Sequence, residues 1–502
     1  MRVSDVLRAV VLGLASCEGE TPSSVDSTDA LLVSDRGPTG DALAAVDALP
    51  SSDVERIQAA DVPIRDTRGA DLGVAADGAD LSSAVDGALA RPRRNVLLII
   101  ADDLGIEAVP CMGVGQNPAP MPNITRLCES GVRFTQAWSE PVCSPTRSGI
   151  LTGRTSISTG VGDIVGDGEL GVPGDAHTLP RALGPMGYAT ANLGKWHLGL
   201  THAADDTPRF FGYDRFSGFL LGGVQSYWGW RHTTDGVTAI DPAYMTTVFA
   251  DEAIEWLGQR GAESWFLWLA FNAPHAPFHL PPPDLHTFDD LEGAAIPMRP
   301  IQHFHAMVEA LDHEVGRVLD ALTLEQRALT VVVFVGDNGS VARVAEPPIP
   351  AGRSKQTLFQ GGLRVPLLIT TPDLVEVNRA VGTPVHTRDL YASVLEWTGA
   401  LVPADSPDGA RRDSVSLVPL LTPGGTLPPR VLRSELFGAS IDTVTGGVAV
   451  RDEQYKLIRT QDGTERLFDL LADPWETSPL DLNGEWAARA GLLRDASDTP
   501  AR

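Results

Sequence analysis

Two clusters of oxygen-bearing side chains follow two apolar runs of the chain. Asp102 and Asp103 follow the run NVLLIIA, and Asp337 and Asn338 follow the run TVVVFVG. Ca²⁺ and Mg²⁺ bind carboxylate and amide oxygens, whereas zinc and copper favour thiolates and several imidazoles, which are absent near these clusters. Singly, an Asp pair often caps a helix and Asp-Asn-Gly is a common turn. Together the clusters predict a divalent-cation site, with calcium favoured over magnesium.

Two further segments carry groups suited to anion binding and proton transfer. In GKWHLGL, Lys195 and His197 lie two residues apart, so an extended chain would direct both side chains toward one face. His275 follows the apolar run WFLWLAFNAP, and prolines on both sides of it restrict its loop. A lysine can hold an anion and a histidine can transfer protons beside it. His279 is predicted to be a rim or structural residue.

Cys143 opens the segment CSPTRSGILTGR, with Pro145 two residues later and Arg147 four residues later. A buried cysteine can be a small core residue, and a cysteine hydrolase would use its thiolate as a nucleophile. Neither interpretation explains why Pro145 and Arg147 stand at these positions.

The Cys143 segment resembles the maturation signature of type I sulfatases. In that family a formylglycine-generating enzyme oxidises the cysteine to an aldehyde, which hydrates to a gem-diol. One hydroxyl of the diol attacks the sulfur of a sulfate ester, and the other is later deprotonated to expel sulfate by C–O cleavage. The resemblance implies that Arg147 lies beside the hydrate as a fixed positive charge. It covers residues 95–470 through five motifs in the expected order.

The same resemblance implies roles for the other candidate residues. The divalent cation would be held by Asp102, Asp103, modified Cys143, Asp337 and Asn338. Lys195 would hold sulfate oxygens, and His197 would assist release of sulfate from the diol. His275 would contact the sulfate ester and help to protonate the leaving oxygen. In SKQTLFQGGLRVP, Lys355 precedes Gly361 by six residues, as in the family, and would be the second sulfate cation and a donor to the departing oxygen.

One sulfate contact of the family stays unassigned in the segment 212–230. Gln225 and Ser226 are both candidates there, and the sequence does not decide between them. The aromatic residues Tyr227, Trp228 and Trp230 could form a sugar-stacking rim, but they are predicted to belong to the hydrophobic core.

Apolar runs alternate with helical patterns from Asn95 onward. Similar runs begin at Trp265, Thr330 and Arg364, and the segment 306–322 repeats apolar residues every three or four positions. This alternation predicts an α/β fold in which a large mixed, mostly parallel sheet is flanked by helices. Short strands after residue 425 predict a smaller C-terminal antiparallel sheet and a final helix from about Glu485. The resemblance implies the fold of the alkaline phosphatase superfamily, with a catalytic domain at 95–425 and a C-terminal subdomain at 426–502.

The first 94 residues differ from the rest of the chain. Residues 1–17 combine basic residues with a short apolar run, which predicts a signal peptide. The run ends in LASC, which resembles a bacterial lipobox with lipidation at Cys17, and a plain signal peptide is the alternative. Residues 18–94 are acidic and lack aromatic residues, which predicts a disordered linker. The protein is therefore expected to be exported, as a periplasmic, membrane-anchored or secreted protein. Cys111 and Cys128 could form a disulfide or remain a reduced pair.

The charge of the chain limits the kinds of partner that it is expected to bind. The net charge of −26 and the lack of a basic stripe argue against a nucleic-acid partner. The resemblance predicts an arylsulfatase-like enzyme that acts on a sulfated small molecule or glycan. Two alternatives are a formylglycine-dependent phosphonate monoester or phosphodiester hydrolase, and a lipid-tethered glycan-binding homologue that does not turn over its ligand.

Overall fold

The computed structural model describes residues 93–498 apart from 167, 170, 200–203, 294, 296–297, 402–412 and 439–444. The predicted signal segment with Cys17 and nearly all of the predicted linker lie outside the described residues, and both stay predictions. Within the described ranges, no helix combines the length and the apolar character needed to cross a membrane.

Ten strands of the described chain form one sheet, in the order β11-β2-β10-β9-β1-β8-β4-β5-β6-β7. The five at its centre, β9, β1, β8, β4 and β5, are parallel, as predicted for apolar runs buried on both faces. The run from Arg364 forms β10, which is antiparallel to β9, so the sheet is mixed. The strands are β1 (Asn95–Ala101), β2 (Val132–Phe134), β4 (Ala189–Lys195), β5 (Arg215–Phe219), β6 (Trp230–Thr234), β7 (Val237–Asp241), β8 (Trp265–Ala270), β9 (Thr330–Gly336), β10 (Leu367–Thr370) and β11 (Arg379–Val381).

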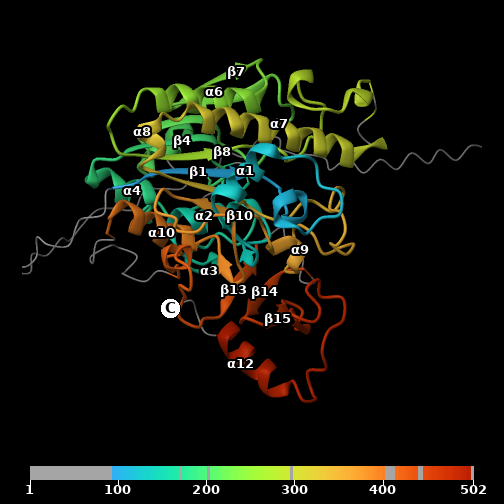
Figure 1. The fold of residues 1–502 in the computed structure, drawn as a ribbon. Coiled ribbons are helices and arrows are strands. Elements are labelled where there is room, and N and C mark those ends of the chain that lie inside the picture. Colours follow the sequence, from blue (N-terminus) through green and yellow to red (C-terminus); the bar gives the residue numbers. More distant parts are fainter. Residues whose placement is uncertain are drawn as a thin grey trace, which may run out of the picture. The chain divides into compact units, whose positions relative to one another are not determined.

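Helices cover both faces of this sheet (Figure 1). Alternate residues of β1 point to opposite faces, so Leu97 and Ile99 join one core cluster while Val96 and Leu98 join the other. The first cluster is covered by α1 (Pro122–Ser130), α6 (Met245–Gly258) and α7 (Pro300–Ala321). The second is covered by α2 (Cys143–Thr152), α4 (Leu179–Leu183) and α10 (Asp389–Thr398). Shorter helices are α3 (Ser156–Thr159), α5 (Thr207–Phe210), α8 (Leu324–Arg327), α9 (Gln360–Leu363) and α11 (Val418–Leu421).

The register of the central strands brings the polar clusters of the sequence together. Ala101, the last residue of β1, pairs with Gly336, the last residue of β9, so Asp102 and Asp337 leave the sheet side by side. β8 and β4 are parallel to β1 and end at the same edge. The chemistry-bearing residues that follow these strands therefore meet at the carboxyl edge.

A separate four-stranded antiparallel sheet follows, as predicted, with a final helix at its end (Figure 1). Its inner residues share a core cluster with Trp138 and with Val142, the residue before Cys143. The sheet therefore packs beside the start of α2. Its elements are β13 (Leu432–Leu436), β14 (Gly447–Arg451), β15 (Tyr455–Thr460), β16 (Glu465–Asp469) and α12 (Ala487–Asp498), and β3 (Ala137–Trp138) pairs with β12 (Val385–His386) as a third, two-stranded sheet.

Cys111 and Cys128 form a disulfide, which decides between the two states that the sequence left open. It links the short turn η2 (Pro110–Met112) to α1. Among the described cysteines, Cys143 is the free one, and it is buried.

A buried ion pair joins the C-terminal sheet to α9. Lys456 Nζ lies 2.5 Å from Glu476 Oε1, and both side chains are fully buried. Glu476 also accepts a hydrogen bond from the Gln360 backbone, and the Lys456 ammonium lies over the Trp138 ring. Each charge therefore depends on the other for its compensation.

We predict that Glu476→Gln lowers the free energy of unfolding by about 3 to 5 kcal/mol, because it leaves the Lys456 charge buried without its counter-ion. Urea denaturation followed by circular dichroism measures the change. Asp498→Asn is the control, since Asp498 is 67% exposed in its pair with Arg459, and such a pair contributes less than about 1 kcal/mol. Equal effects of the two substitutions would contradict the prediction.

Candidate functional site

The predicted metal ligands lie together at the carboxyl edge of the sheet. Ligand atoms of Asp102, Cys143 and Asp337 all lie within 4.8 Å of one another, and the same holds for Asp102, Asp103 and His275. Asn338 Nδ2 donates to Asp103 Oδ1 at 2.8 Å, and the Asp103 amide donates to Asp337 Oδ1 at 3.1 Å. The residues predicted from two separate strand ends thus form one cluster.

The chemistry of this cluster fits a hard cation. Asp102 Oδ1 and Asn338 Oδ1 are buried and have no hydrogen-bond partner among the described atoms. A buried oxygen without a partner is unfavourable, and a cation of the calcium or magnesium type would compensate both oxygens at once. The donors are carboxylate and amide oxygens, which is the set that these ions favour.

Cys143 begins α2 and is 1% exposed. The Lys195 ammonium lies 3.7 Å from its Sγ atom, and the Lys355 ammonium lies 4.0 Å away. Burial nevertheless raises the pKa of the thiol and outweighs these two cations. A reactive cysteine needs a lowered pKa, so the raised pKa of the buried thiol disfavours an unmodified Cys143 thiolate as the nucleophile of a cysteine hydrolase.

Arg147 lies one helical turn after Cys143 and is completely buried. Its guanidinium donates to Asp337 Oδ2 at 2.8 Å and 3.1 Å and to the Lys195 carbonyl at 3.1 Å. Arg147 therefore fixes two neighbours of Cys143 through three hydrogen bonds. The helix ends at Thr152, and Gly153 caps it with a left-handed φ of 71°.

The two lysines pair with the two aspartates that follow β1. Lys195 Nζ lies 2.5 Å from Asp102 Oδ2, and Lys355 Nζ donates to Asp103 Oδ1. Burial alone would raise the pKa of Asp103, but Lys355 and His275 outweigh it and hold that pKa well below its usual value. Burial and Asp102 raise the pKa of Asp337 to about 6 despite Arg147. The cluster thus holds three cations and three acidic side chains.

His197 reaches the site by a different backbone route from the one predicted. The strand β4 ends at Lys195, and His197 has a positive φ of 55°, so the chain between them is not extended as the same-face argument assumed. Its two ring nitrogens are buried and have no hydrogen-bond partner among the described atoms. Burial and then Lys195, Arg147 and Lys355 lower the pKa of His197 well below its usual value, so the ring is neutral.

His275 lies at the boundary between the charged cluster and a cavity. Its Nδ1 atom donates to the Ala276 carbonyl at 2.6 Å, and its Nε2 atom lies 3.7 Å from Asp103 Oδ2. Burial lowers the pKa of His275 to about 4, against the attraction of Asp103. The Nδ1 hydrogen bond leaves Nε2 without a proton in the neutral ring.

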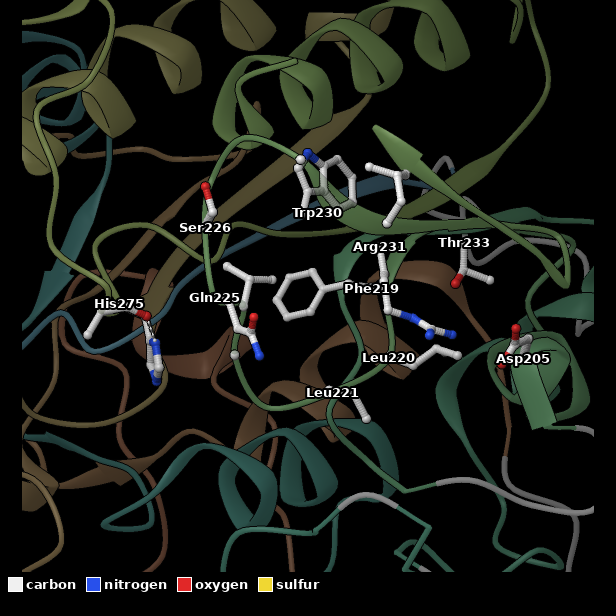
Figure 2. A pocket seen from close by; sticks show the side chains of 15 residues that line it. Asp205, Phe219, Leu220, Leu221, Gln225, Ser226, Trp230, Arg231, Thr233 and His275 are labelled. Carbon is white, nitrogen blue, oxygen red and sulfur yellow. Dashed lines mark hydrogen bonds between the residues drawn. The ribbon is translucent and has the colours of Figure 1, made fainter. Parts of the chain in front are cut away.

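A cavity of about 710 Å³ opens beside His275 (Figure 2). Gln225 and Ser226, the two candidates for the unassigned sulfate contact, both line it. Tyr227 and Trp230 are buried, as predicted for core residues, whereas Trp228 is 39% exposed. Tyr227 donates to the backbone carbonyls of Asn272 and His275, so it anchors the His275 loop.

His279 is held away from the charged cluster. Its ring nitrogens contact the Pro277 carbonyl and the Tyr244 hydroxyl, and its ring packs against Tyr227 and Trp228. These contacts agree with the structural position predicted for it.

Three residues at this site were missed by sequence reasoning. Gly222 and Gly223 pass directly over His197 and His275, and Arg231 lines the cavity. The sequence does contain one signal for the hairpin that carries Arg231. The pair Asp235-Gly236 is typical of a β-hairpin turn, and β6 and β7 flank it. Both turn residues have positive φ angles, 46° and 86°.

Comparison with known proteins places this geometry in a family. The family model described as Sulfatase matches residues 94–400. N-acetylgalactosamine-6-sulfatase of Canis lupus familiaris is 29% identical over 392 residues, covering 70% of each chain. The solved structure of Ps i-CgsB in complex with k-i-k-neocarrahexaose has 26% identity and a TM-score of 0.69, covering 80% of this chain and 91% of that one.

A phosphonate monoester hydrolase of Agrobacterium radiobacter has the same fold, with a TM-score of 0.60 over 80% of this chain and 95% of that one, at 20% identity. That likeness concerns the fold alone. The family model, in contrast, covers more than half of the sequence and includes every predicted site residue. The chain belongs to the sulfatase family, a family of sulfuric ester hydrolases.

Proposed function

We propose that this protein hydrolyses an aryl or carbohydrate sulfate ester with a formylglycine formed from Cys143 and a bound divalent cation, calcium in preference to magnesium. The observation that carries the proposal is the surroundings of Cys143. Two ammonium groups and the carboxylates of Asp102 and Asp337 converge on its buried Sγ atom. Such a site suits an oxygen nucleophile that must meet an anionic substrate.

The cation would be held by Asp102, Asp103, Asp337, Asn338 and the modified side chain at Cys143. When bound, it supplies Lewis-acid stabilisation of charge on the sulfate and on the nucleophilic oxygen. Arg147 donates two hydrogen bonds to Asp337, so it would hold this ligand in position without binding the cation itself. This is consistent with the two buried oxygen atoms that lack a partner.

A formylglycine hydrate at position 143 would supply one hydroxyl to form the new S–O bond, and deprotonation of its second hydroxyl would release sulfate and restore the aldehyde. Lys195 and Lys355 face this position and would bind the sulfate oxygens. Lys355 can also donate a proton or hydrogen bond to the ester oxygen as the S–O bond to the leaving group breaks. His275 lies where the cluster meets the cavity and would contact that oxygen when its Nε2 carries a proton, which Asp103 Oδ2 at 3.7 Å favours.

His197 is suited to take the proton of the second hydroxyl. It is neutral, and its ring nitrogens have no hydrogen-bond partner in the described structure. A neutral imidazole has an acceptor nitrogen that can take a proton, and the negative charge of a bound sulfate would raise its basicity. Water then adds to the aldehyde and restores the hydrate. The proton of the attacking hydroxyl replaces the one that Lys355 gives to the leaving oxygen, and the proton on His197 leaves the site with sulfate or water, so the enzyme returns to its starting state.

The first prediction of this proposal concerns the modification. Protein co-expressed with a formylglycine-generating enzyme should carry an aldehyde at position 143, seen by mass spectrometry as conversion of CH2SH to CHO in that peptide. It should hydrolyse 4-nitrophenyl sulfate, and Cys143→Ala should lose turnover by about 10⁴-fold or more because the nucleophile is absent. An intact thiol in fully active protein would refute the proposed nucleophile.

A parallel assay tests the alternative function. It compares the hydrolysis of phosphonate monoesters and phosphodiesters with that of the sulfate ester. The proposal expects a higher kcat/KM for the sulfate ester. A higher kcat/KM for the phosphorus esters would reassign the enzyme to the alternative class. Binding of sulfated glycans without any turnover by aldehyde-bearing protein would favour the non-catalytic homologue.

The second prediction concerns the cation. Chelation should lower Tm and abolish activity, and Ca²⁺ should restore both, because a ligand that binds only the folded state at 100 times its Kd stabilises it by about 2.7 kcal/mol. Asp102→Asn should reduce the calcium-dependent rise in Tm. Asp290→Asn is the control, since its carboxylate is 65% exposed in a pair with Arg299. No Tm response to Ca²⁺ in the wild-type protein would contradict the assignment.

The third prediction concerns export, which we also propose. If residues 1–17 direct lipidation at Cys17, radiolabelled palmitate should be incorporated into the full chain, and Cys17→Ser should abolish the label. Membrane fractionation of both variants measures the tether. Labelled palmitate in the Cys17→Ser protein would place the lipid elsewhere and overturn this part of the proposal.

A further inference from the structure

The cavity beside His275 shares a wall with the charged cluster. A Cβ atom added to Gly222 would lie 2.4 Å from His197 Nε2, and one added to Gly223 would lie 3.2 Å from His275 Cε1. The loop after β5 therefore runs directly against both imidazoles and then continues along the cavity. Of the predicted catalytic and metal-binding residues, His275 lines this space, so a substrate group attached to the oxygen that His275 contacts would extend toward it.

The opposite wall is the hairpin of β6 and β7. Arg231 pairs with Ile240 and Thr233 pairs with Thr238 in its register, so these positions share one face of the hairpin. Arg231, Thr233 and Ile240 all line the cavity. In Figure 2, His275 and Asp205 lie on opposite sides of the cavity, and Arg231 lies between them.

The charged groups along this wall differ in their partners. Asp205 accepts a hydrogen bond from Thr238 at 2.6 Å, and Thr238 in turn contacts Thr233. Arg231 is exposed and takes part in none of the ion pairs found within the described ranges. Arg147, by contrast, is fully occupied by Asp337 and the Lys195 carbonyl. A guanidinium that faces a cavity without a counter-ion can bind a carboxylate or a sulfate through two parallel hydrogen bonds.

We propose that this cavity binds the leaving group of the substrate and that Arg231 recognises a second anionic group on it, a sulfate or a carboxylate. The proposal rests on the sulfatase function proposed above and specifies its substrate class as a saccharide that carries at least two negative charges. The volume of about 710 Å³ is within the range of small-ligand sites.

The rest of the lining is consistent with a sugar between the two anions. Gln225 and Ser226 offer amide and hydroxyl groups, and Phe219 and Trp230 offer apolar surface. The Asp205 carboxylate disfavours an anion at its end of the cavity and can accept hydrogen bonds from sugar hydroxyls. The second anion is therefore expected near Arg231 and the hydroxyls near Asp205.

Isothermal titration calorimetry on the Cys143→Ala protein tests this without turnover. The probes are matched galactose-based and galactosamine-based disaccharides with one sulfate ester, each made with and without a second sulfate or carboxylate on the neighbouring sugar. The doubly charged member of each pair should bind more tightly. In the Arg231→Gln variant, the ratio of the two affinities should fall by roughly 10- to 100-fold, since a charge-assisted hydrogen bond is lost.

Arg215→Gln is the matched control. Arg215 lies on the neighbouring strand β5, pairs with Asp235 and does not line the cavity, so its loss should leave the affinity ratio as in the parent protein. Arg231→Lys should retain part of the preference, because the charge remains but the two-pronged geometry is lost. Thermal melting of each variant establishes that it is folded.

Equal binding of both members of each pair by the parent protein, or an affinity ratio unchanged by Arg231→Gln, would overturn the assignment of Arg231. Failure of the sulfatase function itself would appear elsewhere, as absence of 4-nitrophenyl sulfate hydrolysis by aldehyde-bearing wild-type protein. The two failures are therefore distinguishable.

Discussion

The balance of charge in a buried cluster is the constraint on which the rest of this structure depends. The cluster contains three basic and three acidic side chains, and all six are buried. The basic ones are Arg147, Lys195 and Lys355, and the acidic ones are Asp102, Asp103 and Asp337. Buried charges persist only when each is compensated by its neighbours. With the carboxylates ionised, the three positive and three negative charges cancel, so the side chains alone offer an anion little net attraction. A divalent cation among the same oxygens would give the cluster the positive charge that an anionic ester requires.

The fold holds this cluster by converging rigid elements rather than by long loops. β1 and β9 deliver two pairs of ligands in register, and β4 delivers Lys195 at the same edge. Cys143 comes from the first turn of α2, whose preceding residue, Val142, packs against the C-terminal sheet. Glu140 accepts hydrogen bonds from Arg388 and from the Glu435 backbone. These bonds connect the segment before Cys143 to the start of α10 and to β13. The smaller sheet thus contributes to the position of Cys143 although none of the site residues belongs to it.

The sequence was informative where strand ends and motifs coincide. The apolar runs before Asp102 and Asp337 predicted parallel strands, and parallel strands end at a common edge, so the convergence of these residues followed from pattern alone. The expectation of an extended chain from Lys195 to His197 was wrong, because His197 has a positive φ and residue spacing cannot reveal that. Arg231 was not predicted as a site residue, for another reason. Its strand is short and largely polar, and only the Asp235-Gly236 turn marks the hairpin that directs it into the cavity. The roles of these residues in catalysis remain predictions.

The disulfide between Cys111 and Cys128 bears on the order of maturation. If the chain is exported, as proposed, a further thiol at position 143 could exchange with either partner, because a thiolate can attack a disulfide. In the folded protein, burial of Cys143 prevents that attack. In the unfolded chain nothing does, so conversion of the side chain to an aldehyde before folding would also remove a competitor for correct pairing. The same chemistry that creates the nucleophile would then protect the covalent framework around it.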